Sequence, residues 1–197
     1  MTDFYDAIYR SNPNVWSKPA RDEFAFAALK DHEPASMLDI GCGSGHTLRY
    51  FMDRWPEVEY YGVDTSKVAL ELARKNVKGA TFFDDLWQAP RVTLITMMGV
   101  LEHFPELAEL RNVRQHLAPG GRMYIEVPNC LNYSQTQEEG FRPTNGRNRQ
   151  TEWHLRRTTW EKTLTENGLE IITSLKGLNE AWEFVWLCRQ SNLSIGM

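Results

Sequence analysis

A short apolar segment that leads directly into a glycine-rich turn constrains this chain most. Residues 36–45 read SMLDIGCGSG, and residues 46–55 that follow carry apolar side chains at helical spacing. Glycines in such a turn allow positive φ and let a bound cofactor approach the backbone. A strand, a glycine turn and a helix in this order are typical of a nucleotide-cofactor site. A tight turn with nothing bound is the alternative.

Strand-like and helix-like segments then alternate along most of the chain. Such alternation predicts an α/β fold, here a Rossmann-like three-layer α/β/α sandwich of about seven strands. Two successive strands close the chain without a helix between them, so we expect the last strand to be antiparallel. The expected helices cover 20–31, 46–55, 66–77 with Ser66 as N-cap, 105–117 and 158–168, and the expected inner strands cover 58–64, 80–83, 91–98 and 121–129.

The length of 197 residues predicts a single domain. Within it we expect a leader and helix over 1–35, a cofactor-binding core over 36–130, a lid or solvated loop over 130–157, and a final helix and strand pair over 158–189.

Composition and charge exclude several classes of protein. The net charge of −4 disfavours a nucleic-acid partner, which usually meets a basic face. No stretch has the apolar length of a membrane span, and the start MTDFYDAIYR lacks the apolar core of a signal peptide. Cys42, Cys130 and Cys188 fit neither a disulfide framework nor a zinc ribbon, so we expect a cytoplasmic protein.

Two residues of the turn discriminate between cofactors. A dinucleotide-binding turn reads G-x-G-x-x-G, yet its third glycine position is His46 here. Asp39 stands two residues before the first glycine, where a carboxylate would repel a pyrophosphate. It would instead suit the cationic ammonium and sulfonium groups of S-adenosylmethionine. An NAD-dependent oxidoreductase is therefore disfavoured.

Further carboxylates follow the next two strands. Asp64 ends the second strand, where a carboxylate can accept hydrogen bonds from both ribose hydroxyls, unless it only caps the following helix. Asp84 and Asp85 follow the third strand. Of these we prefer Asp85 for the adenine amino group, with Leu86 against the ring; two acids in a surface turn are the alternative.

The segments LDIGCGSG, YYGVD, FFDDL, MMGVLEHF and LAPGGRMYIEVPN, in this order, resemble the class I S-adenosylmethionine-dependent methyltransferases. The resemblance covers residues 36–130 closely and points to the quinone and small-molecule O-methyltransferases. It implies S-adenosylmethionine as the cofactor. The residues it implies for cofactor binding are Asp39, Gly41, Cys42, Gly43, Gly45, Asp64, Thr65, Asp85, Leu86 and Met98, with Gly99 close to the sulfonium.

Methyl transfer from a sulfonium is an in-line displacement that needs alignment and the exclusion of water. A general base helps when the acceptor is a hydroxyl group. His103, just past the fourth strand, is the best candidate for a catalytic base, followed by Glu102. A substrate contact or a purely structural role remains open for His103.

A metal-dependent alternative is weaker. Some relatives use a Glu-x-x-Glu-His cluster and a later histidine, whereas Gly99 replaces the first glutamate here. Glu102, His103 and His154 remain, and a hard divalent ion usually requires more oxygen ligands. We therefore expect no metal ion.

The sequence leaves the acceptor unnamed. Tyr9, Trp16, Arg147, Arg149 and His154 are the candidate substrate residues, because aromatic side chains can close over a site and arginines bind anions. We expect methyl transfer to a small-molecule acceptor, an anionic one if the arginines bind it, with oxygen as the receiving atom. The alternatives are an RNA- or nucleotide-modifying methyltransferase and a non-catalytic cofactor-binding module.

Overall fold

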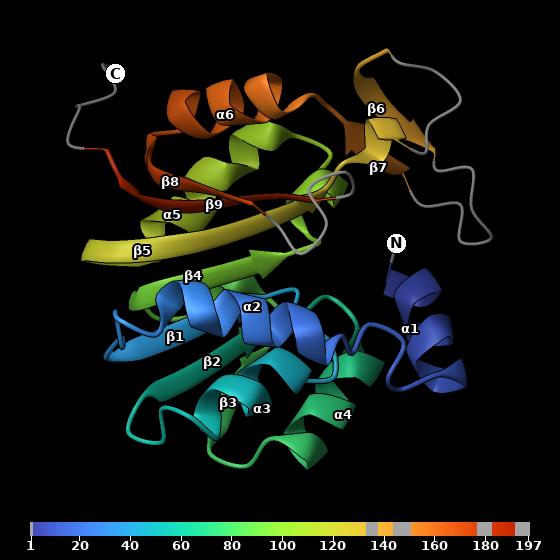
Figure 1. Ribbon diagram of the computed structural model, residues 1–197. Helices are drawn as coiled ribbons and strands as arrows, with labels where there is room; N and C mark the ends of the chain where they lie inside the picture. Colours follow the sequence, from blue (N-terminus) through green and yellow to red (C-terminus); the bar gives the residue numbers. More distant parts are fainter. Residues whose placement is uncertain (1, 133–137, 144–150, 177–182, 192–197) are drawn as a thin grey trace. The chain divides into compact units, whose positions relative to one another are not determined.

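The computed structural model describes residues 2–132, 138–143, 151–176 and 183–191 (Figure 1). It divides into two compact units, Met1–Thr96 and Met97–Met197, which we describe separately. Arg147 and Arg149, two of the predicted substrate residues, lie outside the described residues.

The first unit is built on parallel strands. Strand β1 pairs with β2, and β2 pairs with β3, both in parallel register, with Leu38 opposite Tyr61 and Val63 opposite Phe83. Every residue of β1 after Ser36 is buried, as expected for a strand covered on both faces. The elements of this unit are α1 (Thr2–Ser11), α2 (Pro19–Leu29), β1 (Ser36–Ile40), α3 (His46–Met52), β2 (Glu59–Val63), α4 (Lys67–Asn76), β3 (Ala80–Phe83), the 3-10 turn η1 (Leu86–Gln88) and β4 (Val92–Met98), whose last two residues enter the second unit.

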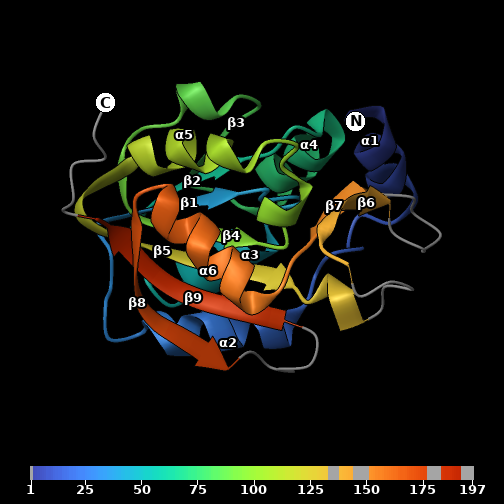
Figure 2. The same cartoon turned by 90° about the horizontal axis from the view of Figure 1, so that it is seen from above.

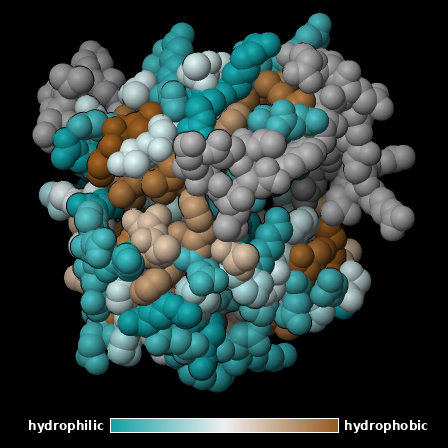
Figure 3. All heavy atoms as spheres, in the orientation of Figure 1, coloured by the Kyte–Doolittle hydropathy of each residue, from teal (hydrophilic) through white to brown (hydrophobic). Residues whose placement is uncertain are grey.

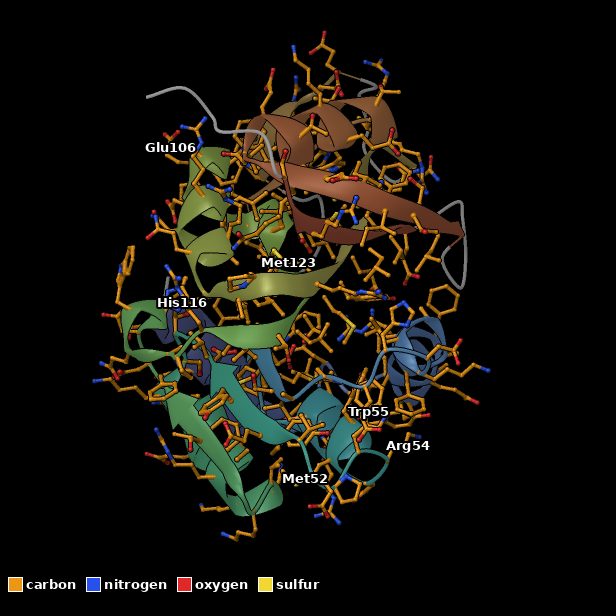
Figure 4. All side chains as sticks on the ribbon, turned by 90° about the vertical axis from the view of Figure 1, so that its left-hand side faces the viewer. Met52, Arg54, Trp55, Glu106, His116 and Met123 are labelled. Atoms are coloured by element: carbon orange, nitrogen blue, oxygen red, sulfur yellow. The ribbon has the colours of Figure 1, made fainter. Side chains whose placement is uncertain are left out.

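Helices α2, α3 and α4 pack side by side, since α2 contacts α3 and α3 contacts α4. Side chains of α2, of α3 and of the segment after α3 form an aromatic cluster in which Phe51 is fully buried, with its ring centroid 5.5 Å from that of Phe26 and 5.4 Å from that of Trp55. Figure 4 labels Trp55 beside Arg54, just past the end of α3. Ser66 caps α4 as predicted, because its hydroxyl accepts the Ala69 amide hydrogen.

The second unit is built on antiparallel strands. Strand β5 pairs with β9, and β9 pairs with β8, with Met123 of β5 opposite Cys188 (Figure 4 labels Met123). Helices α5 and α6 lie next to each other in Figures 1 and 2, and the Arg111 guanidinium donates to the carbonyl oxygen of Glu166. The elements are η2 (Leu101–His103), η3 (Leu107–Glu109), α5 (Leu110–Gln115), β5 (Leu117–Pro128), η4 (Cys130–Asn132), β6 (Gly140–Pro143), β7 (Thr151–His154), α6 (Arg157–Glu166), β8 (Leu169–Lys176) and β9 (Glu183–Gln190).

Among the described residues the main sheet has seven strands in the order β3-β2-β1-β4-β5-β9-β8. Strand β1 stands between β2 and β4, so the order reverses at the strand that leads into the glycine turn. Helices flank the strands, and the last strand is antiparallel to both of its neighbours. The predicted α/β, Rossmann-like fold is confirmed.

Several local predictions were wrong. The leader contains a helix, α1, for which no helix was predicted. The helix expected over 105–117 is regular only in α5, because 3-10 turns precede it. The segment LAPGG is part of β5, with Gly120 at φ 76°, and is not a separate turn.

The expected loop over 130–157 contains two strands. Strands β6 and β7 pair antiparallel in a separate sheet, with Phe141 opposite Trp153. The rings of these two residues lie 5.2 Å apart between centroids. The indole nitrogen of Trp153 also donates to the carbonyl oxygen of Phe104 at 2.8 Å, which fixes β7 beside η2.

Hydrophobic residues at the surface occur in separate patches among hydrophilic ones on the face shown in Figure 3. Among the described side chains, the exposed large hydrophobic ones are Trp87 and Ile172. None of the helices in the described part of the chain has the length and apolar character needed to cross a membrane.

The aromatic cluster generates a stability prediction. Phe51→Ala removes a fully buried ring and leaves a cavity, so we expect a loss of about 3–5 kcal/mol in the free energy of unfolding, measured by urea denaturation. Trp87→Ala is the matched control, because this ring is 61% exposed. Equal losses in both variants would contradict the assignment of the cluster to the core.

Candidate functional site

The glycine turn after β1 requires glycine on backbone grounds. Gly41, Gly43 and Gly45 have φ of 70°, 53° and 85°, in the left-handed region that favours glycine. A Cβ at Gly45 would also lie 2.7 Å from a methyl carbon of Val77. The amides of Gly41 and Cys42 both donate to the carbonyl oxygen of Val63. The turn is therefore held against the end of β2.

Asp64, the residue after β2, joins the turn to α4. One of its carboxylate oxygens accepts the Gly43 amide hydrogen at 2.8 Å, and the other accepts the Ser66 amide hydrogen at 2.8 Å. Burial raises the pKa of Asp64, and these two hydrogen bonds oppose that rise. Each carboxylate oxygen has a second lone pair, so the group retains the capacity to accept hydrogen bonds from a ligand.

Asp39 is a buried carboxylate at the carboxyl end of β1. Only 4% of the residue is exposed, and its polar contact is with the Thr96 hydroxyl, which donates to Oδ1 at 2.6 Å. Burial raises the pKa of Asp39 to about 7 although this hydrogen bond lowers it. A carboxylate in such a position is stabilised by a cationic ligand.

Helix α1 covers the glycine turn. The phenol of Tyr9 is buried against Gly43, so closely that a Cβ at Gly43 would collide with the Tyr9 hydroxyl. Burial raises the pKa of Tyr9 strongly, and the nearby Asp64 raises it further. Asp6 of α1 accepts the Ser66 hydroxyl hydrogen at 2.6 Å, and Figures 1 and 2 both show α1 beside α4.

The remaining predicted cofactor residues of the first unit are exposed or half-buried. Asp85 is exposed, and its Oδ1 accepts the Trp87 amide hydrogen at 3.0 Å, which caps η1. Leu86 is half-buried and Thr65 is exposed. Trp16 is half-buried in the turn between α1 and α2.

In the second unit, η2 carries the predicted catalytic residues. His103 Nδ1 lies 3.4 Å from the carbonyl oxygen of Thr151, which accepts a hydrogen bond in the tautomer or charge state that carries a hydrogen on Nδ1. Nε2 lies 3.8 Å from a carboxylate oxygen of the buried Glu102. Burial lowers the pKa of His103, while Glu152 raises it.

Met98 is buried just before Gly99, which has φ 70°.

A second group of buried polar side chains lies in the same unit. Cys130 of η4 donates its thiol hydrogen to Glu152 of β7, with 3.1 Å between Sγ and Oε2. His154 lies two residues further along β7, and burial lowers its pKa. Among the described residues, potential metal-ligand atoms gather in the group Cys130, Glu152 and His154. Glu102 and His103, which the sequence analysis weighed together with His154 as possible metal ligands, are not members of this group.

The structure thus brings Asp39, Gly41, Cys42, Gly43, Gly45, Asp64 and Tyr9 together in the first unit. Their chemistry fits S-adenosylmethionine, because a buried carboxylate suits a cationic group and glycines in the left-handed region suit a turn that a cofactor approaches closely. Sequence reasoning missed Thr96 and Asp6, whose signals are a single hydroxyl and a single carboxylate group, and it gave Ser66 only as the cap of its helix. It also missed Cys130 and Glu152.

Comparison with known proteins agrees with this geometry. The sequence pattern of the family described as a methyltransferase domain matches residues 13–174. The chain is 32% identical over 136 residues to a trans-aconitate 2-methyltransferase of Rhodopseudomonas palustris (strain BisA53), covering 66% of this chain and 52% of the relative. A trans-aconitate 2-methyltransferase of Azoarcus sp. (strain BH72) is 33% identical over 151 residues, covering 74% and 58%. The chain spans about half the length of these curated relatives.

Solved structures share the fold. The 1,6-didemethyltoxoflavin-N1-methyltransferase of Burkholderia thailandensis, solved with 1,6-didemethyltoxoflavin and S-adenosylhomocysteine, has a TM-score of 0.74 at 18% identity, covering 97% of this chain and 87% of that one. A S-adenosylmethionine-dependent methyltransferase of Clostridium acetobutylicum ATCC 824 has a TM-score of 0.70 at 14% identity, covering 96% and 99%.

The predicted family and cofactor are confirmed by the extent of the family match and by the identity to the relatives. The chain belongs to the methyltransferase-domain family of class I S-adenosylmethionine-dependent methyltransferases.

Proposed function

We propose that this protein transfers a methyl group to an oxygen atom of a small anionic acceptor. The buried carboxylate of Asp39 beside a turn of left-handed glycines carries the cofactor-binding part of this proposal, and the trans-aconitate relatives support its acceptor part. When bound, S-adenosylmethionine supplies a methyl group on a positively charged sulfur atom. The chain's own residues then have to hold that group, orient the acceptor and exclude water.

Asp39, Cys42 and the three turn glycines hold the methionine part of the cofactor in this proposal. Asp39 balances the ammonium charge, and the glycines allow close approach to the backbone. Asp64 holds the ribose with the lone pairs that Gly43 and Ser66 leave open. Asp85, Leu86 and Thr65 contribute on the adenosine side, and Met98 on the methyl side.

A carboxylate is the acceptor group that we favour. The curated relatives named above are methyltransferases for trans-aconitate, whose name denotes a carboxylic acid anion. The net charge of −4 is unfavourable for a polyanion such as RNA and favours a small acceptor instead. A carboxylate is ionised at neutral pH, so its oxygen attacks without a general base.

A hydroxyl acceptor is the second candidate, and the position of His103 beside the buried Glu102 favours it. A neutral imidazole can take a proton from a hydroxyl group, and Glu102 would stabilise the imidazolium that forms. Tyr9, Trp16 and His154 remain proposed acceptor contacts, as do Arg147 and Arg149 from the sequence alone. A cytoplasmic location stays a prediction.

Asp39 generates the first prediction. Its pKa of about 7 lies above the ordinary value of 3.8, so folding stability falls as the pH rises through the folded pKa. Asp39→Asn should therefore stabilise the cofactor-free protein by about 1–4 kcal/mol at pH 8 and have little effect at pH 4. The same variant should lose S-adenosylmethionine binding by calorimetry. A variant that is less stable at pH 8 and still binds would refute this role.

Asp64 generates the second prediction. Asp64→Ala removes an ionised acceptor and should weaken S-adenosylhomocysteine binding by about 10–150-fold, which is ~1.5–3 kcal/mol. Because Asp64 also fixes the glycine turn, the free energy of unfolding should fall as well. Its position at a strand end would by itself predict no such loss. Asp53→Ala, an exposed acid at the end of α3, is the matched control. Cofactor affinity equal to that of the control would exclude ribose binding.

His103 distinguishes the two acceptors. Burial lowers its pKa, which favours the neutral imidazole, and the residue becomes charged as the pH falls. With a hydroxyl acceptor, kcat should fall along that limb, and His103→Ala should lose the limb and about 10²–10⁴-fold in kcat. With a carboxylate acceptor, we expect no such limb and a smaller effect of His103→Ala. Rates measured from pH 5 to 8 in both proteins decide between them.

A further inference from the structure

The buried group Cys130, Glu152 and His154 has no part in cofactor binding as proposed above. Cys130 comes from η4, and Glu152 and His154 come from β7. Their exposed fractions are 0%, 8% and 3%, so all three are shielded from solvent. One donor atom from each side chain lies within 4.8 Å of the other two. These three donors can therefore share one ligand of atomic size.

His154 points to such a ligand independently of that spacing. Both of its ring nitrogens are buried, and neither has a hydrogen-bond partner in the described part of the chain. A buried imidazole normally makes at least one hydrogen bond, because an unpartnered polar atom costs free energy. The ring is thus placed to give a nitrogen lone pair to a ligand, because the described residues offer its nitrogens no hydrogen-bond partner.

We propose that Cys130, Glu152 and His154 bind a zinc ion. Zinc takes sulfur, imidazole nitrogen and carboxylate oxygen together, whereas Mg²⁺ and Ca²⁺ require oxygen ligands. On binding, the S–H bond of Cys130 breaks, a bond between sulfur and zinc forms, and the proton passes to the solvent. No oxidant or reductant is involved.

The charges of this site balance. A thiolate and a carboxylate carry two negative charges, which equal the double positive charge of zinc, and the imidazole is neutral. A net neutral group is the form that a buried position tolerates. With three protein ligands, zinc keeps a fourth position for water. The ion would also join η4 to β7 and so hold the β6–β7 hairpin in place.

Cobalt binding tests the proposal directly, because a bond between Co²⁺ and a thiolate gives a charge-transfer band in the near ultraviolet. The purified full chain, stripped with a chelator, should develop this band and saturate at about one Co²⁺ per chain. Zinc added afterwards should abolish it. Cys130→Ala should lose the band, whereas Cys188→Ala, which removes an equally buried thiol from β9, should keep it.

A second measurement does not depend on the cysteine variant. Zinc should raise the thermal unfolding midpoint of the wild type and of Cys188→Ala, because the ion binds the folded state. His154→Gln should weaken zinc binding by at least about tenfold, and His116→Gln, a buried histidine at the end of α5 (Figure 4), should not. A wild type with neither the cobalt band nor a zinc-dependent midpoint overturns the proposal, as does a band that persists in Cys130→Ala.

Discussion

The first unit depends on the two hydrogen bonds that the carboxylate of Asp64 accepts. This carboxylate accepts amide hydrogens from Gly43 and Ser66 and so ties the turn after β1 to the start of α4. Ser66 in turn caps α4 and donates its hydroxyl to Asp6, which anchors α1. One charged side chain at the end of β2 therefore coordinates three segments that are far apart in the sequence.

Burial of the Asp39 carboxylate costs folding free energy. A carboxylate with 4% exposure and a pKa near 7 lowers the stability of the empty protein at neutral pH. A buried carboxylate of this kind is stabilised when a ligand supplies the opposite charge. In the second unit Glu152 and His154 are also buried, and Glu152 accepts the thiol hydrogen of Cys130.

Much of the first unit could be predicted from sequence, because the signals there are local. The turn glycines follow an apolar strand directly, and the alternation of strands and helices specifies which strand ends carry Asp39 and Asp64. Helix α1 was missed, although Phe4, Tyr5, Ile8 and Tyr9 follow helical spacing. The dense aromatics and the prolines at 13 and 19 concealed that pattern.

The second unit was harder to predict for a physical reason. Cys130 and Glu152 are 22 residues apart, and they meet only because β6 and β7 pair and Trp153 fastens β7 to η2. Strands of four residues leave almost no periodic signal. A contact that depends on such pairing cannot be deduced from spacing, whereas one made by neighbouring strand ends can.

The position of Tyr9 has a consequence for the timing of ligand exchange. Its ring rests on Gly43, at the point of the turn where a bound cofactor would lie nearest the backbone. A ligand that occupied this point would have to displace the Tyr9 ring, and with it part of α1. If the contact between Asp6 and Ser66 broke in that displacement, the strength of this one hydrogen bond on α4 would contribute to the residence time of the ligand.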